Sequence, residues 1–407
     1  MSISAQHTVL NPILETLRQK GNSSFAKQGI PTPKNESFKY TKFRELNLDN
    51  FVFAKQEHKY CCNEHKLGFD AYEVVFCNGK LCHNHCSGLD NIEVLPLIEA
   101  IKDKTSQKYL NKSFDMNNFP FAALNNAYLE QGLFIRVAKD YVADKPLALV
   151  YHLVANEKYF CNIHNVIVVE NNAKLDLVEY YYHTGDIKAE YFNNVVNEFF
   201  ISKNATLNHY KVQNDAFKAF HIALNVANVK SQAKYDSFCL QKGANLARNE
   251  TVVNLLEEKA QTEVNGAYII NGWANVDTTT QIRHLHSDTL SSQLVKGVAG
   301  GCAKGVFQGK IHIAPNAVKT NGYQLHKALL ISDDACVNVK PELEIFADDV
   351  KCSHGSTCGE IDKEQMFYLR SRGISEQNAK QILIEAFINE LFDKISNSNI
   401  VNWLKSF

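Results

Sequence analysis

The chain of 407 residues has a formal net charge of −1, with 43 Lys and Arg against 44 Asp and Glu, and 45% of its residues are hydrophobic. This balance gives no electrostatic basis for binding nucleic acid or an anionic membrane surface, and no run of about eighteen apolar residues predicts a membrane span. Eleven irregularly spaced cysteines and the lack of a secretion signal indicate a reducing compartment, so we expect a cytoplasmic protein.

The N-terminal region, residues 1–145, is predicted to be partly helical and partly extended. Asn11, followed by a proline at the first helical position, begins a helix that we expect to end before Gly21. A strand at 72–76 precedes Asn78-Gly79, a residue pair typical of a tight hairpin turn. Further short elements are predicted at 95–101, 122–127 and 133–137.

Potential metal ligands gather in the segment 61–86 of this region. They are Cys61, Cys62, His65, Cys77, Cys82, His83, His85 and Cys86. Structural zinc sites usually show two matching Cys-x2–4-Cys knuckles, whereas Cys61 and Cys62 are adjacent and the other cysteines fit that spacing only loosely. The spacing favours a strand in which cysteines act as small apolar side chains, with a zinc-binding adaptor as the alternative.

Strand-like runs without a convincing helix between them extend from residue 146 to residue 347. A short unit with a central alanine recurs at Ala173, Ala205 and Ala233, at spacings of 32 and 28 residues. Repeats of this length made of short strands are typical of a solenoid, in which a small alanine suits the corner where coils stack. Asn-Gly hairpin turns, which a β-sandwich would need, are few. Looser repeats lie at Ala260, Ala303, Ala317 and Ala335.

We therefore predict a parallel β-helix over residues 146–347. About 200 residues at roughly 25–30 residues per coil correspond to about seven or eight coils.

The segment from Lys340 to Gly359 begins as a strand in which apolar and polar residues alternate. If the backbone stays extended, Cys352 and His354 point to the same face, because side chains alternate along a strand. A thiol and an imidazole placed in this way could both bind one metal or sulfur atom. The alternative is a strand end with a buried cysteine and a hydrogen-bonded histidine.

The last part of the chain, 348–407, is predicted to be helical after this segment. Asp362 and Ser375 are expected to cap two helices. The second helix carries an apolar stripe at helical spacing, made of Ala379, Ile382, Leu383, Ala386, Phe387, Leu391 and Ile395. Two explanations stay open for the stripe: packing against the β-helix end, or docking of a partner through Leu383, Phe387 and Leu391.

Several segments closely resemble the SufB/SufD family of iron–sulfur cluster assembly subunits. They are the block Lys340–Gly355, Phe367–Gly373, Ser291–Gly297 with His284 seven residues before it, Phe307–Ile313 and Phe38–Thr41. The Asp348–Gly355 block resembles the SufD branch of the family rather than the SufB branch. His326, Val339 and Cys358 differ from the residues that are usual in the family.

The resemblance implies a right-handed parallel β-helix between an N-terminal helical region and a C-terminal helical domain. It implies a non-enzymatic scaffold that forms a heterodimer with SufB through the β-helix ends and binds the SufC ATPase through its C-terminal helices. It further implies a transient iron–sulfur cluster shared with SufB; a flavin in the complex is possible but does not follow from the residues.

The resemblance also assigns site residues. The family's cysteine and histidine correspond to Cys352 and His354, of which the histidine is the more important. His284 and Cys358 are secondary candidates, and Cys358 leaves open which thiol acts.

A carbohydrate-active enzyme is the alternative function for a β-helix. That chemistry needs carboxylates grouped on one strand face in neighbouring coils, and the middle of the chain has no recurring acidic position. No Gly-rich phosphate-binding loop occurs either. We therefore expect the isolated chain to have no catalytic activity.

Overall fold

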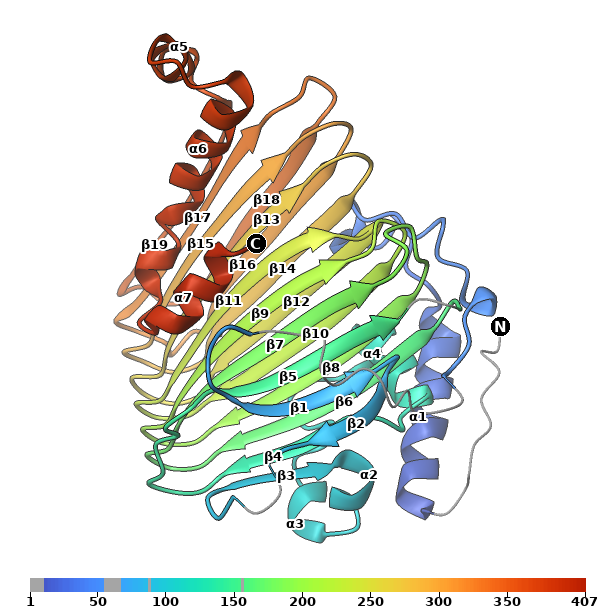
Figure 1. Ribbon diagram of the computed structural model, residues 1–407. Helices are drawn as coiled ribbons and strands as arrows, with labels where there is room; N and C mark the ends of the chain where they lie inside the picture. Colours follow the sequence, from blue (N-terminus) through green and yellow to red (C-terminus); the bar gives the residue numbers. More distant parts are fainter. Residues whose placement is uncertain (1–10, 55–66, 87–88, 155–156) are drawn as a thin grey trace.

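The computed structural model of the chain describes residues 11–54, 67–86, 89–154 and 157–407. Two long sheets dominate it, and from β4 onward successive strands alternate between them (Figure 1). Each turn of the chain adds one strand to each sheet, parallel to the strand of the previous turn. The predicted parallel β-helix is thus confirmed, with about eight coils.

The first sheet has the order β19-β17-β15-β13-β11-β9-β7-β5-β1-β2. Its strands are β1 Tyr72–Cys77, β2 Lys80–Asn84, β5 Leu147–Val154, β7 Lys174–Thr184, β9 Thr206–Asp215, β11 Lys234–Gly243, β13 Gln261–Ile270, β15 Leu290–Ala299, β17 Thr320–Leu330 and β19 Val350–Glu360. Only β1 and β2 pair in antiparallel fashion within it, as the predicted Asn78-Gly79 hairpin.

The second sheet has the order β18-β16-β14-β12-β10-β8-β6-β4-β3. Its strands are β3 Ile92–Pro96, β4 Leu133–Val137, β6 Phe160–Val169, β8 Phe192–Ile201, β10 Phe220–Val229, β12 Leu246–Leu255, β14 Asn275–His284, β16 Lys304–Ile313 and β18 Cys336–Ile345. The antiparallel pair β3 and β4 forms the N-terminal end of this sheet.

The recurring alanines lie at the corners before β7, β9 and β11. Ala173, Ala205 and Ala233 are almost completely buried, so successive coils stack closely there. The residue before each alanine has a φ of 58° to 61°, which turns the chain sharply: Asn172, Asn204 and Gln232. Ala260 and Ala317 lie at the same side of the solenoid, whereas Ala303 and Ala335 precede β16 and β18 at the opposite corner.

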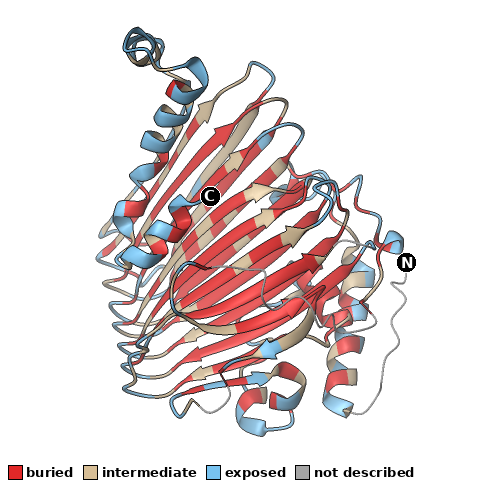
Figure 2. Ribbon diagram, in the orientation of Figure 1, coloured by how far each residue is buried: buried red, intermediate tan, exposed pale blue. Residues whose placement is uncertain are grey.

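The interior between the two sheets, here called the lumen, is closely filled in the middle coils and open at the C-terminal end. Nine of the ten residues of β10 are buried, whereas no residue of β18 or β19 is buried. Figure 2 shows this decrease in burial along the solenoid.

The N-terminal region covers the outer face of the second sheet and the first coils. Its helices are α1 Pro12–Gln28, α2 Leu97–Ala100, α3 Lys104–Gln107 and α4 Pro120–Ala127, with short 3-10 turns at Glu36–Phe38, Leu48–Asn50 and Met116–Asn118. Asn11 caps α1 as predicted, but the expectation that the helix ends before Gly21 is wrong. A Cβ at Gly21 would lie 2.4 Å from the backbone nitrogen of Ala127, so this glycine permits close contact between α1 and α4.

Of the three C-terminal helices, the last two pack on the outer face of the first sheet rather than on the end of the β-helix, while the first projects away from it (Figure 1). They are α5 Lys363–Ser371, α6 Glu376–Asn389 and α7 Ser398–Lys405, with a 3-10 turn at Phe392–Lys394 between the last two. Trp403 of α7 lies edge-on to Tyr180 of β7, with ring centroids 5.5 Å apart. Asp362 and Ser375 cap α5 and α6, as predicted.

The segment after residue 347 belongs to the solenoid before the chain becomes helical. β19 pairs with β17 over its whole length, so Asp348 and Asp349 form the corner between β18 and β19. The predicted division between residues 347 and 348 therefore falls inside the last coil. No described helix is long and apolar enough to cross a membrane.

The possible zinc ligands do not come together in the described part of the chain. Cys61, Cys62 and His65 lie outside the described residues. Cys77 is disulfide-bonded, and Cys86 is buried in the hydrophobic core. The described residues contain no group of three or more His, Cys, Asp or Glu side chains suited to hold a metal ion.

Candidate functional site at the open end of the solenoid

The last coil, residues 336–360, is here called the terminal coil. Its strands β18 and β19 each pair with only one neighbour, β16 and β17 respectively. The second edge of each strand is unpaired among the described residues, and the lumen opens to solvent between them. Such edges expose backbone donors and acceptors that can pair with another strand.

The register between β17 and β19 shows which side chains face the lumen. Gln324 and His326 of β17 are 3% and 0% exposed and lie between the two sheets. In-register neighbours in a parallel sheet point to the same side, so β19 directs Cys352, His354 and Cys358 into the open lumen.

Cys352 and His354 form one possible binding site, and Cys358 lies apart from them. A separation of two positions along a strand spans about 7 Å, whereas the six positions from Cys352 to Cys358 span about 20 Å. Cys352 is half-buried and packs against a small apolar cluster around Ile311. His354 and Cys358 are exposed because no further coil covers them.

The two thiols are protonated at neutral pH when no metal is bound. Burial raises the pKa of both Cys352 and Cys358. A metal or a sulfur donor must therefore displace a proton before either sulfur can form a bond.

His284 lies inside the lumen, one coil further from the open end than Gly322. It is 0% exposed, and its Nδ1 and Nε2 atoms lie 2.8 Å from Thr289 Oγ1 and 2.8 Å from Ser291 Oγ. Burial and, to a smaller extent, His312 lower the pKa of His284 to about 4, so the ring is neutral at physiological pH. This secondary candidate is hydrogen-bonded inside the solenoid and does not lie on the terminal coil.

A second buried histidine, His326, was not among the predicted site residues. Its Nε2 lies 3.1 Å from the hydroxyl of Tyr268, and its ring stacks on Phe307 at 5.0 Å. The Tyr268 ring fills the space left by Gly297 and Gly305, where a Cβ would overlap it. The buried side of β17 carries polar residues such as Gln324 and His326, so apolar–polar alternation in the sequence does not mark the lumen side of this strand.

The predicted docking stripe on α6 is partly buried. Leu391 is 0% exposed against the first sheet, so its side chain is not available to a partner. Phe387 is half-buried, and the ammonium group of Lys296 lies 4.8 Å from its ring. Leu383 is half-buried as well, while Phe367 and Tyr368 of α5 are 74% and 57% exposed.

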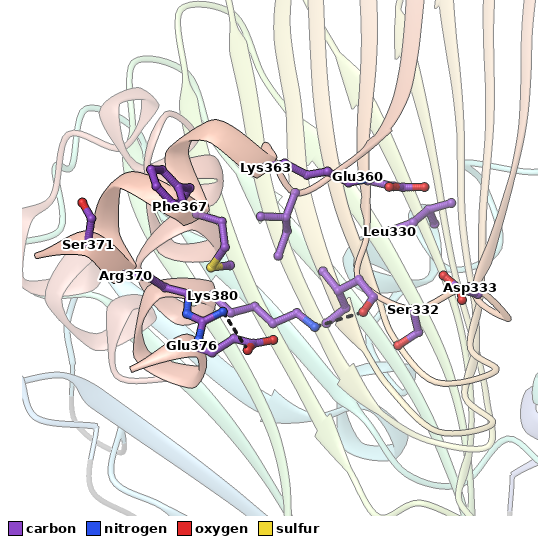
Figure 3. A pocket seen from close by; sticks show the side chains of 13 residues that line it. Leu330, Ser332, Asp333, Glu360, Lys363, Phe367, Arg370, Ser371, Glu376 and Lys380 are labelled. Atoms are coloured by element: carbon purple, nitrogen blue, oxygen red, sulfur yellow. Dashed lines mark hydrogen bonds and ion pairs between the residues drawn. The ribbon is translucent and has the colours of Figure 1, made fainter. Parts of the chain in front are cut away.

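A cleft of about 690 Å³ separates α5 and the start of α6 from the corner between β17 and β18 (Figure 3). Lys380 crosses it and donates a hydrogen bond to the carbonyl of Ile331 at 3.0 Å. Arg370 and Glu376 form an ion pair at 3.5 Å across the turn between the helices. No residue of α5 is buried; Met366 and Leu369 are half-buried, and the other residues of the helix are exposed.

The fold and the site define a class of protein: a β-solenoid with an open terminal coil, a thiol–imidazole pair facing its lumen, and helical regions at both ends of the chain. Residues 152–387 match the SufBD core domain of the SUF system for FeS cluster assembly, and residues 4–149 match the SufBD N-terminal region. The chain belongs to the SufBD family of iron–sulfur cluster assembly proteins.

Individual relatives agree with this assignment. An iron–sulfur cluster assembly SufBD family protein of Synechocystis is 29% identical over 97% of this chain and 90% of its own length. Iron–sulfur cluster assembly protein SufD of Escherichia coli is 29% identical over 91% of this chain and 87% of its own length. SufD of Bacillus subtilis is 25% identical over 77% of this chain and 72% of its own length. The chain thus has a role in iron–sulfur cluster assembly.

Proposed function

We propose that this chain is a SufD-type scaffold subunit, without catalytic activity of its own, on which an iron–sulfur cluster forms at a junction with SufB. The observation that carries the proposal is the pair Cys352 and His354, which faces the lumen at the unpaired terminal coil. Thiolate is the usual protein ligand of iron–sulfur clusters, and imidazole can replace it. Two ligands from one chain hold a cluster incompletely, which suits a cluster that must form with a partner and then leave.

SufB is the proposed partner at the terminal coil. The unpaired edges of β18 and β19 can add strands from a second solenoid, which would continue both sheets. Apolar side chains at this end support the same contact, since Ile345 is 41% exposed and the neighbouring Phe346 is 60% exposed. A heterodimer formed in this way would bring the ligands of both subunits to one place.

The SufC ATPase is the proposed partner of α5 and α6. The exposed rings of Phe367 and Tyr368, together with Ile382 at 42% exposure, form an apolar surface that the solenoid does not cover. Leu383 and Phe387 lie beside it, half-buried, while the buried Leu391 only holds α6 in place.

The proposed location is the cytoplasm. Apart from the disulfide-bonded Cys77, the described cysteines form no disulfide, Cys352 included, and a reducing compartment keeps most thiols in that state. The buried carboxylates of Glu179, Glu198 and Asp215 each bind a histidine inside the protein, so they do not supply the exposed acidic pair of a carbohydrate-active enzyme.

The test compares complexes isolated anaerobically after co-expression with SufB and SufC. His354→Ala should lower iron and acid-labile sulfide at least about tenfold, since loss of residues that merely support a metal ligand costs that much affinity. Cys352→Ser should lower them less, because thiols of SufB can still hold sulfur, and Cys358→Val should match the wild type. Equal amounts of SufB and SufC in all samples would show that assembly is intact.

Full cluster content in the His354→Ala complex would reject the assignment. Loss of cluster in Cys358→Val alone would move the site to Cys358.

A further inference from the structure

The chain contains four Asn-Gly pairs, and one of them lies on the surface at a corner of the solenoid. Asn271 and Gly272 begin the corner between β13 and β14, and both are exposed. Asn271 also lines an open pocket of about 650 Å³ beside Trp273, so water reaches its side chain. Asparagine is a thermally labile residue, and a following glycine has no side chain that could shield its amide from the main chain.

The side chain of Asn271 is folded back onto the main chain of the next residue. The backbone N–H of Gly272 donates a hydrogen bond to Asn271 Oδ1 at 2.8 Å. Because a C=O bond is about 1.23 Å long, this contact holds the Gly272 nitrogen roughly 3.1–3.6 Å from the amide carbon Cγ of Asn271, for the usual angles at a carbonyl oxygen. Atoms that react with one another begin from separations of about 3–3.5 Å, so the nitrogen lies within reach of that carbon.

Glycines of the same corner and of the next one allow this arrangement. A Cβ at Gly300 would lie 3.1 Å from Asn271 Oδ1, and a Cβ at Gly301 would lie 3.0 Å from it. Any side chain between β15 and β16 at these positions would therefore press on the Asn271 amide. Gly272 itself has a φ of 68°, a backbone conformation that glycine adopts readily.

We infer that Asn271 is a site of spontaneous modification, where deamidation through a five-membered succinimide produces aspartate and isoaspartate. The nitrogen of Gly272 gives up its proton and forms a bond to Cγ of Asn271. The bond from Cγ to Nδ2 breaks, and the amide nitrogen leaves as ammonia after it has taken up that proton through water. A water molecule then opens the ring at one of its two carbonyls. Opening at Cγ gives aspartate, whereas opening at the main-chain carbonyl gives isoaspartate.

The other three Asn-Gly pairs are held in ways that oppose the same reaction. Asn78 is 1% exposed, and its Oδ1 accepts a hydrogen bond from the N–H of Val154 at 2.8 Å. Asn265 is 7% exposed, and its Oδ1 accepts from the N–H of Leu294 at 3.1 Å. Asn265 and Asn321 lie in β13 and β17, which pair with a strand on each side and keep the following glycine extended. These asparagines are internal references for Asn271.

The isoaspartate would disturb the contact between two corners of the solenoid. The carbonyl of Gly272 accepts a hydrogen bond from the N–H of Cys302 at 2.8 Å, and the N–H of Ala274 lies 3.4 Å from the carbonyl of Asn271. Isoaspartate adds one atom to the main chain inside this corner, so its carbonyls no longer match their donors. We therefore expect the modified chain to be less stable than the original.

The experiment incubates the folded full-length chain at physiological pH and temperature, and mass spectrometry of peptides follows the mass increase at each asparagine. Asn271 should deamidate at least about tenfold faster than Asn265 and Asn321, because a strand must open locally before its glycine nitrogen can attack. Asn316 is the control for exposure alone, since it lies on an exposed corner but precedes Ala317, and it should react at least about tenfold more slowly as well. Methyl transfer by a protein isoaspartyl methyltransferase would measure the isoaspartate separately.

Two further samples separate the role of the fold from that of the sequence. In the chain unfolded by urea the four Asn-Gly pairs should react at similar rates, because none is held by its neighbours. Asn271→Gln keeps an amide at the corner but would have to form a larger ring, so it should stay unmodified and, after the same incubation, keep the melting temperature that the wild type loses. Equal rates at Asn271 and Asn265 in the folded chain would overturn the inference, as would an unmodified Asn271 in a folded chain whose unfolded form reacts. An unchanged melting temperature of the modified wild type would reject the disturbance of the corner.

Discussion

Two histidines in the lumen are kept uncharged by burial, and this links folding to pH. His326 has one hydrogen-bond partner, Tyr268, and its Nδ1 has none among the described residues. Burial lowers the pKa of His326 to about 4, as it does for His284. An unfolded histidine titrates near pH 6.5, so between these values the unfolded chain binds protons that the folded chain does not.

The free energy of unfolding should therefore be highest above pH 6.5 and fall as the pH approaches 4. Over that pH interval, each of the two histidines lowers the free energy of unfolding by about 3 kcal/mol. His326→Gln should remove one such contribution and flatten the dependence, which urea unfolding between pH 7 and pH 4 would measure. The exposed His286→Gln is the control and should follow the wild type. An unchanged slope in His326→Gln would mean that the buried ring titrates normally.

The sequence is sufficient to predict the ligand pair, but it does not predict the contacts that surround the pair. Alternation along a strand is a local property, so it places Cys352 and His354 on one face without knowledge of the fold. The hydrogen bonds of His284 and the contact of His326 with Tyr268 depend on how one coil lies above another. That register follows from the length of each coil, which varies between 27 and 32 residues along the first sheet from β7 onward.

At the level of elements, α5 is one of the described elements without a buried residue. Its rings are exposed, and a cleft separates it from the solenoid corner. The rings of Phe367 and Tyr368 are mostly exposed and so contribute little to folding, which favours a role in binding.

Phe367→Asp should therefore weaken binding of SufC at least about tenfold, because exposed aromatic residues commonly dominate such contacts. Thermal stability should change little, since the Phe367 ring is already 74% exposed. Co-purification and calorimetric titration with SufC would measure the effect. Val142→Asp, on a side chain that is 60% exposed near the first coils, is the control. Wild-type affinity in the Phe367 variant would remove α5 from the proposed interface.

Elements that depend on local sequence rules are predicted correctly, and the wrong predictions arise from contacts between distant parts of the chain. The corner alanines, the Asn78-Gly79 hairpin and the caps of α5 and α6 follow from local rules. Gly21 fails as a helix end because α4 approaches it closely. The apolar stripe of α6 is ambiguous in the sequence, because a helix that packs on a sheet and one that binds a partner need the same spacing.

At the level of the whole molecule, the solenoid is asymmetric: at its N-terminal end each sheet finishes in a short antiparallel strand, β2 or β3, whereas at its C-terminal end each finishes in a long parallel strand, β18 or β19. This asymmetry leads to a prediction about SufB. Ile345→Glu places a charge among the lumen-facing apolar residues of β18 and should weaken SufB co-purification at least about tenfold.

The thermal stability of Ile345→Glu should stay close to that of the wild type, because the side chain is 41% exposed. Trp273→Glu is the matched control, since Trp273 is 80% exposed at the corner between β13 and β14, away from the terminal coil. Equal loss of SufB in both variants would indicate a general effect of charge rather than an interface at the coil end.

The position of the terminal coil at one end of the stack also affects its local stability. In a stack where each unit is held only by its neighbours, the end unit is supported from one side and opens most readily by local unfolding. The strand that bears Cys352 and His354 is such an end unit, so the ligands belong to the part of the molecule that frays first. A partner that continues the sheets would stiffen this strand and assemble its ligands in the same event, so that the site becomes rigid only when both halves are present.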